Sequence, residues 1–143
     1  MKYKILVVDD DENICEGDNT YTNYVVSEML NVTLSPYPDF VVTQVTLPDN
    51  AIAGSTINMS YTVENRGVRK VLPSEKWVDK IYISSEPQFK EDKAVMVGMK
   101  DKNGYLDVND LYTETLNITV PANITTSQYI YVVTDADNDI FEY

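Results

Sequence analysis

A strict two-residue alternation is the feature that most constrains how this chain can fold. In residues 56–64 the apolar side chains occupy every second position, at Ile57, Met59, Tyr61 and Val63. Successive side chains of an extended strand point to opposite faces, so this pattern predicts a strand with one buried and one solvated face. Residues 65–67, Asn-Arg-Gly, follow it with turn-forming chemistry.

Strand signals recur along the rest of the chain. Short apolar or alternating runs bounded by Pro, Gly or Asn predict further strands at residues 30–34, 40–47, 77–84, 116–120 and 129–134. No window of helical length sustains the 3.6-residue period of an amphipathic helix. Several short strands at this spacing predict an all-β fold, an antiparallel two-sheet sandwich of about seven strands.

Charge and composition exclude several classes of function. The chain has 23 acidic and 11 basic residues and no histidine, which gives a net charge of −12. A field of this sign repels nucleic acid and anionic lipid and attracts cations. Without histidine, transition-metal binding and histidine-based catalysis are both disfavoured, so we expect no enzyme activity. Cys15 is the single cysteine, has no internal disulfide partner, and is expected to be a small buried residue.

The two ends of the chain resemble each other. Residues 3–17 align with residues 129–143, each as an apolar strand followed by an acidic turn, one apolar residue and a glutamate. We therefore interpret residues 1–36 as the tail of a preceding repeat, with its last strands and a linker. Residues 37–143 are then a β-sandwich that lacks its own final strand. No run approaches 18 apolar residues, and the first residues lack a signal-peptide cleavage site, so a secretion signal would lie outside this chain.

The missing strand has a counterpart in the first copy, at residues 20–34. An open sheet edge is tolerated badly, so we expect this segment to pair with the sandwich, either in its own chain or in another molecule. The second arrangement is strand donation, which builds head-to-tail filaments. The expected partners are thus neighbouring repeats or identical subunits.

Parts of this sequence resemble two known protein families. Residues 4–12, Lys-Ile-Leu-Val-Val-Asp-Asp-Asp-Glu, resemble the start of a response-regulator receiver domain, where an acidic pair holds magnesium for phosphoryl transfer. A receiver requires an amphipathic helix next, but residues 17–22 are Gly-Asp-Asn-Thr-Tyr-Thr. The alternating βα pattern never follows, and the acidic segment is repeated at the far end, so the receiver interpretation is disfavoured.

The second resemblance covers nearly the whole chain. The motifs at residues 38–45, 53–54, 64–67, 77–84, 119–121 and 133–142 follow the order of a CARDB repeat. The resemblance implies an immunoglobulin-like sandwich that occurs in tandem in large bacterial and archaeal surface proteins. It also implies an extracellular or cell-surface location and a role related to cell adhesion, with an extracellular glycan or protein as a further partner.

The acidic turns are candidate calcium sites. Calcium takes 6 to 8 hard oxygen ligands in irregular geometry, and carboxylates two residues apart can converge on one ion. The alternative is a solvated acidic turn in an acidic protein. The candidate ligands are Asp135, Asp137, Asp139 and Glu142, and in the first copy Asp9, Asp11, Asn13 and Glu16. Residues 101–107 hint at a calcium loop, but Tyr112 stands where the bidentate Glu is needed, so a plain turn is expected there.

Four N-glycosylation patterns are present, at Asn31, Asn58, Asn117 and Asn123. Such patterns also arise by chance in a chain rich in Asn and Thr. Asn31, Asn58 and Asn117 lie on the polar side of their predicted strands, where a glycan could project.

The sequence supports three hypotheses for the function. The first is a non-catalytic structural or adhesive repeat of a prokaryotic surface or secreted protein, stabilised by calcium. The second is a self-assembling extracellular filament subunit closed by donor-strand exchange. The third is a carbohydrate-binding module. A row of exposed Tyr or Trp would favour the third, although Trp77 is expected in the core of the sandwich.

Overall fold

The computed structural model describes residues 28–142. Six strands follow one another, and a single turn of 3₁₀ helix, η1 (Glu91–Lys93), lies between the third and the fourth. The strands are β1 (Phe40–Thr46), β2 (Thr56–Asn65), β3 (Lys76–Ser84), β4 (Val95–Asn103), β5 (Leu111–Thr119) and β6 (Tyr129–Val133). No helix among the described residues is long and apolar enough to cross a membrane.

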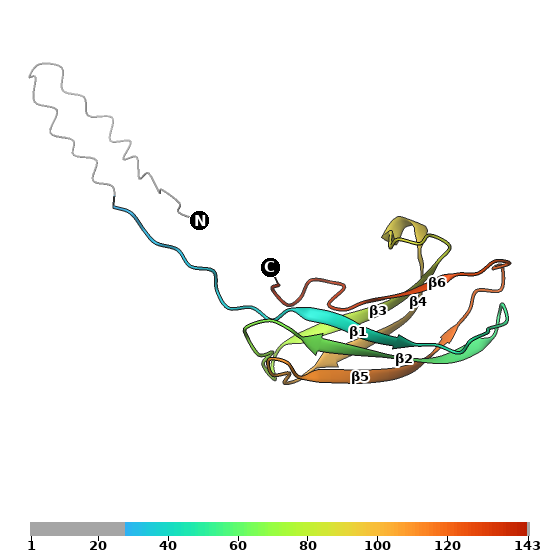
Figure 1. Cartoon of the computed structure of the whole chain (residues 1–143), viewed down its shortest axis with the longest axis horizontal. Helices are drawn as coiled ribbons and strands as arrows, with labels where there is room; N and C mark the ends of the chain where they lie inside the picture. Colours follow the sequence, from blue (N-terminus) through green and yellow to red (C-terminus); the bar gives the residue numbers. More distant parts are fainter. Residues whose placement is uncertain (1–27, 143) are drawn as a thin grey trace, which may run out of the picture. The chain divides into compact units, whose positions relative to one another are not determined.

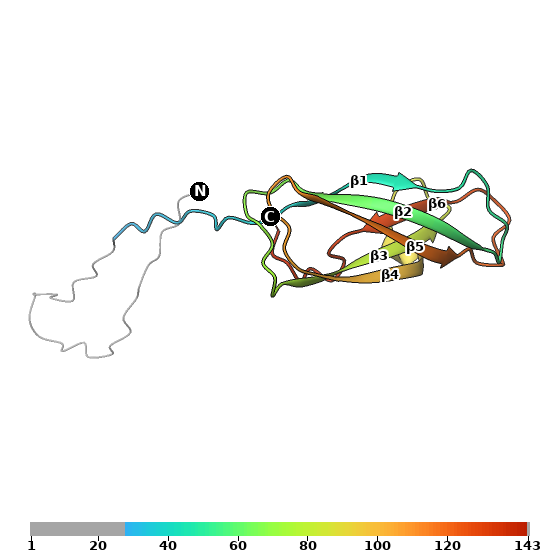
Figure 2. The same ribbon diagram turned by 90° about the horizontal axis from the view of Figure 1, so that it is seen from below.

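The strands form two three-stranded sheets that pack face to face (Figures 1 and 2). One sheet has the order β1-β2-β5 and the other β4-β3-β6, and every pairing is antiparallel. The predicted all-β sandwich is therefore confirmed, with six strands in the described residues rather than about seven. The chain divides into two units, Met1–Ser35 and Pro36–Tyr143, and the second holds both sheets.

The core lies between the sheets and uses the predicted alternation. In β2 the side chains of Met59, Tyr61 and Val63 are buried, whereas Asn58 on the opposite face is exposed. Trp77 on β3 is also buried, as expected, and stacks on Phe40 with ring centroids 5.0 Å apart. The other buried members of the core are Val71, Ile81, Leu106, Ile118 and Ile140.

Three details of the sequence prediction are wrong. Residues 30–34 form no strand, and Leu30, Val32 and Leu34 are exposed. Their alternation suits a strand, but a strand needs a hydrogen-bonded neighbour, and none pairs with it within the described residues. Strand β4 was not predicted, and the predicted turn at residues 101–107 begins only at Gly104, because residues 101–103 still pair with β3.

Candidate functional site

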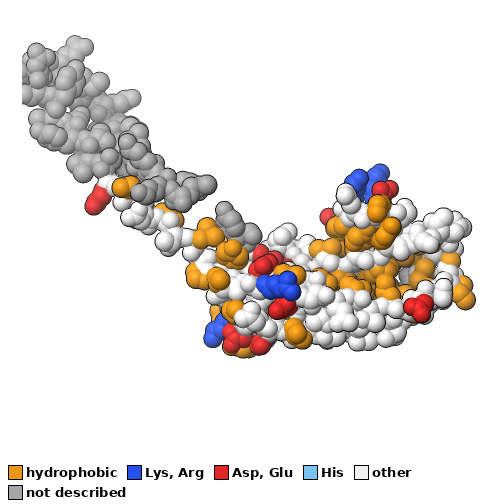
Figure 3. All heavy atoms as spheres, viewed as in Figure 1, with side chains coloured by type: hydrophobic (Ala, Val, Ile, Leu, Met, Phe, Trp, Pro, Cys, Tyr) orange, Lys and Arg blue, Asp and Glu red, His pale blue; other side chains and the backbone are white. Residues whose placement is uncertain are grey.

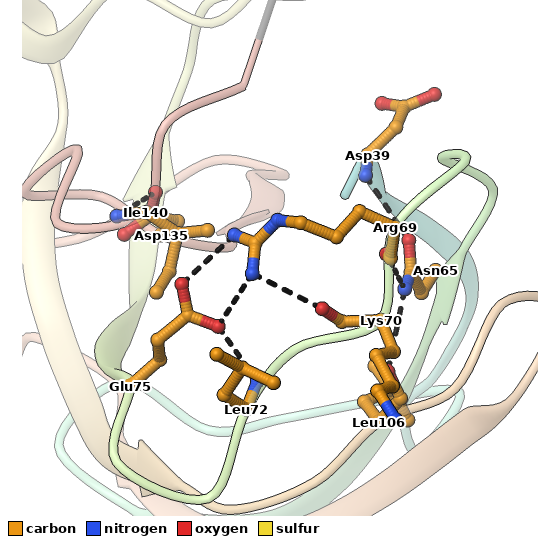
Figure 4. A network of polar contacts seen from close by, with 9 residues as sticks. All are labelled: Asp39, Asn65, Arg69, Lys70, Leu72, Glu75, Leu106, Asp135 and Ile140. Carbon is orange, nitrogen blue, oxygen red and sulfur yellow. Dashed lines mark hydrogen bonds and ion pairs between the residues drawn. The ribbon is translucent and has the colours of Figure 1, made fainter. Parts of the chain in front are cut away.

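The acidic turn after β6 is organised by Asp135. This residue adopts a left-handed backbone conformation, with φ +45, and its carboxylate is buried. One carboxylate oxygen accepts the N–H of Asp139 at 3.0 Å. The other accepts the N–H of Ile140 at 3.1 Å (Figure 4). The side chain therefore caps its own turn and places Ile140 in the core of the sandwich.

The other predicted calcium ligands of this turn have separate partners. Asp137 forms an ion pair with Lys80 of β3, and Asp139 is exposed. Glu142 accepts the main-chain N–H of Phe40 at 2.8 Å and so ties the end of the described chain to the start of β1. Among residues 28–142 no three Asp or Glu side chains gather in a group that could hold a metal ion. Asp9, Asp11, Asn13 and Glu16 lie outside the described residues, as does Cys15.

Glu142 is the titratable group of the turn with the largest shift. Burial raises its pKa from 4.5 to about 7; the hydrogen bond from Phe40 lowers it, and the neighbouring carboxylates of Asp135 and Asp39 raise it. Burial also raises the pKa of Asp135, against the two main-chain N–H groups that it accepts. A proton on Glu142 is thus bound more tightly by the folded chain than by the unfolded one.

We expect this linkage to appear as a pH dependence of stability. The contribution of Glu142 to the free energy of unfolding is complete below about pH 4.5 and is lost as the pH rises through about 7. Glu142→Gln keeps an oxygen that accepts from Phe40 and removes the charge. In calcium-free buffer the variant should exceed the wild type in free energy of unfolding by about 1–2 kcal/mol at pH 8, after discounting for solvent screening.

Urea denaturation of both proteins at pH 4.5, 6 and 8 measures the effect. The difference between variant and wild type should shrink to about 0.4 kcal/mol at pH 4.5, because Glu142 is then protonated in the folded chain and half protonated in the unfolded one. A difference that stays constant across the three pH values would assign it to packing and not to titration.

A buried carboxylate that the sequence analysis missed lies on β3. Asp79 is fully buried, and one of its oxygens accepts the hydroxyls of Tyr61 at 2.8 Å and Tyr112 at 2.7 Å. Its other oxygen has no partner among the described residues. Burial raises the pKa of both tyrosines, and the carboxylate of Asp79 raises them further. Its position in the sequence could have predicted its burial, since Asp79 lies between the inward-facing Trp77 and Ile81.

The connection from β2 to β3 is held by a second polar network, centred on the fully buried Asn65 (Figure 4). Its side-chain oxygen accepts the N–H groups of Asp39 and Gly67, both at 3.1 Å. Its amide nitrogen donates to the carbonyl oxygens of Arg69 at 2.9 Å and Leu106 at 3.4 Å. One side chain thus joins the start of β1, its own turn and the connection between β4 and β5.

An aromatic group covers part of the outer face of the sheet formed by β4, β3 and β6. Tyr82 lies opposite Tyr131 in register, and Phe89 packs on both rings, at 5.2 and 5.4 Å between centroids. Tyr129 continues the row at 6.3 Å from Tyr131. Tyr82 is buried beneath its neighbours, while half of Tyr129 and 38% of Phe89 are exposed.

A groove of about 490 Å³ opens between the two sheets, at the end where the β1–β2 and β5–β6 connections lie. Its lining comes from both sheets and both connections and is partly polar and partly apolar. The large apolar members are Leu47, Ile57, Ile83, Val120, Ile124 and Ile130. Figure 3 shows hydrophobic side chains around a hollow on this part of the surface. The pairing order leaves one edge of β6, beside this groove, without a neighbouring strand in the described residues.

All four glycosylation candidates are exposed: Asn31, Asn58, Asn117 and Asn123. Asn58 and Asn117 face each other across β2 and β5, and the amide nitrogen of Asn58 donates to the side-chain oxygen of Asn117 at 3.0 Å. Their position on the polar face is as predicted. Glycosylation of any of the four stays a prediction.

The family comparison points to one domain type. The CARDB family model matches residues 37–143. Among curated proteins, none has a sequence that matches this one.

Several solved structures are similar to parts of this chain at low sequence identity. The β-glucosidase 3B of Thermotoga neapolitana is 18% identical, with a TM-score of 0.41 over 67% of this chain and 11% of that one. The β-glucosidase of Kluyveromyces marxianus is 16% identical, with a TM-score of 0.43 over 82% and 14%. The β-glucosidase of Listeria innocua is 15% identical, with a TM-score of 0.44 over 97% and 21%. The chain thus spans about a tenth to a fifth of the length of these enzymes.

Proposed function

This chain belongs to the CARDB family, and on that premise we propose that it is a non-catalytic structural or adhesive module of a bacterial cell-surface or secreted protein. The observation that carries the proposal is the family match over residues 37–143, which coincides with the two-sheet sandwich. Acidic surface charge is compatible with this role, because it keeps a module soluble and gives it no attraction for nucleic acid.

The proposed location on the cell surface can be tested directly. An antibody raised against residues 37–143 should label intact bacteria that produce the parent protein, without permeabilisation. Mild protease treatment of intact cells should remove the signal. Labelling that appears only after the cells are permeabilised would contradict the proposed function.

Calcium binding at the acidic turn is a further part of the proposal. The turn is already held by hydrogen bonds and an ion pair without an ion. Asp135 is already satisfied by two main-chain N–H groups, and Asp137 by Lys80. An ion would therefore need the exposed carboxylate of Asp139 together with main-chain oxygens or water. Support comes from the charge of −12, which concentrates cations near the surface.

Thermal melting with 5 mM calcium or with excess chelator tests this proposal. A ligand that binds only the folded state, present at about 100 times its Kd, stabilises that state by about 2.7 kcal/mol. The expected result is a higher melting temperature in calcium and a loss of this gain in Asp139→Asn. Magnesium at the same concentration controls for ionic strength. Equal melting temperatures in calcium and in chelator would remove calcium from the function.

A second candidate function is carbohydrate recognition by the aromatic group on the outer face of β6. It is favoured by the exposed rings of Tyr129 and Phe89, because aromatic faces present large rigid apolar surfaces with a polar tip. Binding of the purified chain to immobilised bacterial polysaccharides is the measurement. Tyr129→Ala should weaken binding, whereas Thr113→Ala on the outer face of the other sheet should not. Equal binding by both variants would rule out this surface.

A further inference from the structure

The free edge of β6 and the groove beside it form an unfilled position in the sandwich. Inward-facing Ile130 and Val132 of β6 pack against the core, so a strand added at this edge would continue an existing apolar layer. The opposite side of the sandwich is closed differently, because Lys100 and Lys102 of β4 pair with Glu114 of β5 across the gap between the sheets. Among the described residues, the open side has no strand beside β6 and no ion pair between the sheets, and the hydrogen bond of Glu142 holds only the start of β1.

The chain also carries a segment with the pattern that such an edge accepts. Leu30, Val32 and Leu34 are 56%, 52% and 57% exposed, and they alternate with the polar Asn31 and Thr33. An added strand contributes main-chain hydrogen bonds, and its alternate side chains enter the pockets of the acceptor. Leaving three large apolar side chains in water costs about 1.5–3 kcal/mol each relative to full burial.

For an antiparallel strand, the length of the chain decides between its own sandwich and another. Tyr37 and Asp39 are fixed at the start of β1, because their carbonyl oxygens accept the N–H groups of Val68 at 3.0 Å and Arg66 at 2.7 Å. Leu47, which lines the groove, lies ten residues after Tyr37 along an extended segment. Because an extended segment rises about 3.3 Å per residue, the groove and Tyr37 lie at opposite ends of it. An antiparallel strand beside β6 would place Leu34 near that groove. The two residues between Leu34 and Tyr37 cannot span the distance from the groove to Tyr37.

We propose that residues 29–34 of a second copy of this chain occupy the edge of β6 as an antiparallel strand. Leu30, Val32 and Leu34 then enter the layer of Ile130 and Val132, and Thr33 lies on the outer face near Tyr129. Each copy donates one segment and accepts another, so the contact is head-to-tail and can propagate into a filament. The inference rests on the proposed module role, to which it adds the partner and the mode of assembly.

Sedimentation of the complete chain at 10–300 µM in 150 mM salt tests the assembly, since this salt screens much of the repulsion between chains of charge −12. The wild type should form concentration-dependent oligomers. Leu30→Asp/Val32→Asp should raise the apparent Kd of assembly by about 30-fold or more. Asn31→Asp/Thr33→Asp adds the same charge on the other face of the segment and should stay within about threefold of the wild type.

Disulfide trapping in a Cys15→Ser background identifies the contact. A chain carrying Thr33→Cys, mixed with a chain carrying Tyr129→Cys or Tyr131→Cys and oxidised, should give a covalent heterodimer. Thr113→Cys on exposed β5 is the acceptor control and should give none.

Three results would overturn the proposal: a monomer at every concentration, equal assembly of the two Asp double variants, or equal trapping by the Thr113→Cys control. A disulfide that forms within one chain carrying both Thr33→Cys and Tyr129→Cys would also overturn it, because it places the segment on its own sandwich. None of these results bears on surface labelling of intact cells, so the module role is tested separately.

Discussion

Asn65→Ala should lower the free energy of unfolding of the sandwich by about 3–5 kcal/mol. Asn65 is fully buried and makes four hydrogen bonds, two as acceptor and two as donor. Removing its amide leaves the N–H groups of Asp39 and Gly67 and the carbonyl oxygen of Arg69 without these partners. Each buried main-chain group left unsatisfied costs about 1–3 kcal/mol, and water has little access to this site.

Asn58→Ala is the matched control for this prediction, because it removes the same amide from the same strand. Asn58 is exposed, and its hydrogen bond to Asn117 can be replaced by water, so we expect a loss of at most about 1 kcal/mol. Chemical denaturation of both variants gives the comparison. A loss for Asn65→Ala no larger than that for Asn58→Ala would show that the network contributes no specific stability.

The role of Asn65 also shows what the sequence could and could not reveal. Its place at the end of a strand, before Arg66 and Gly67, correctly predicted a turn. The chemistry of a turn is local, so it can be read from neighbouring residues. The bonds to Asp39 and Leu106 join residues 26 and 41 positions away. No local pattern encodes them, because they depend on which strands become neighbours in space.

The strand predictions succeeded for four strands, missed β4, and found only the second half of β5. Strands β1, β2, β3 and β6 were predicted to within about one residue at each end. The two-residue period identified β2, whereas β6 was identified by its continuous run of aromatic and β-branched residues. In β4 this pattern is broken by Gly98 and by the charged Lys100 and Lys102. A Cβ at Gly98 would lie 3.1 Å from side-chain atoms of both Leu116 and Ile118, so the glycine allows a close approach to β5.

The acidic turn was identified from the sequence, but the partners of its carboxylates were not. The repeated acidic segment predicted a turn followed by an apolar residue and a glutamate. In the structure Ile140 is buried in the core, whereas Phe141, which aligns with Cys15, is exposed. The spacing of its carboxylates suggested convergence on an ion. In the structure Asp135 turns inward onto main-chain N–H groups, while Asp137 turns toward Lys80. Sequence spacing cannot distinguish these directions, because they depend on the left-handed backbone at Asp135.

The largest steric effect is expected at Gly67. A Cβ built there would lie 2.5 Å from the Cα and carbonyl carbon of Pro38 and from the nitrogen of Asp39. These are main-chain atoms and Pro38 is fully buried, so no side-chain rotation can relieve the contact. Gly67→Ala must push the start of β1 away and break the bond from Arg66 N–H to the Asp39 carbonyl. We expect a loss of about 3 kcal/mol or more in free energy of unfolding.

Gly104→Ala separates this steric effect from backbone strain. Gly104 has φ +116, but a Cβ there meets nothing within 4 Å, so only the conformational cost remains, about 1–2 kcal/mol. The loss for Gly67→Ala should therefore exceed that for Gly104→Ala in urea denaturation. The opposite order would mean that the start of β1 yields easily and is not held by the turn at residues 65–67.

Combining Gly67→Ala with Asn65→Ala tests whether the two residues act on one structure. Both hold the segment at Pro38 and Asp39 against the turn after β2. Once one substitution has released this segment, the other has less left to disrupt. The double variant should therefore lose less stability than the sum of the single losses, by about 1 kcal/mol or more. Strict additivity would assign the two residues to independent sites, and the start of β1 would then have two separate anchors.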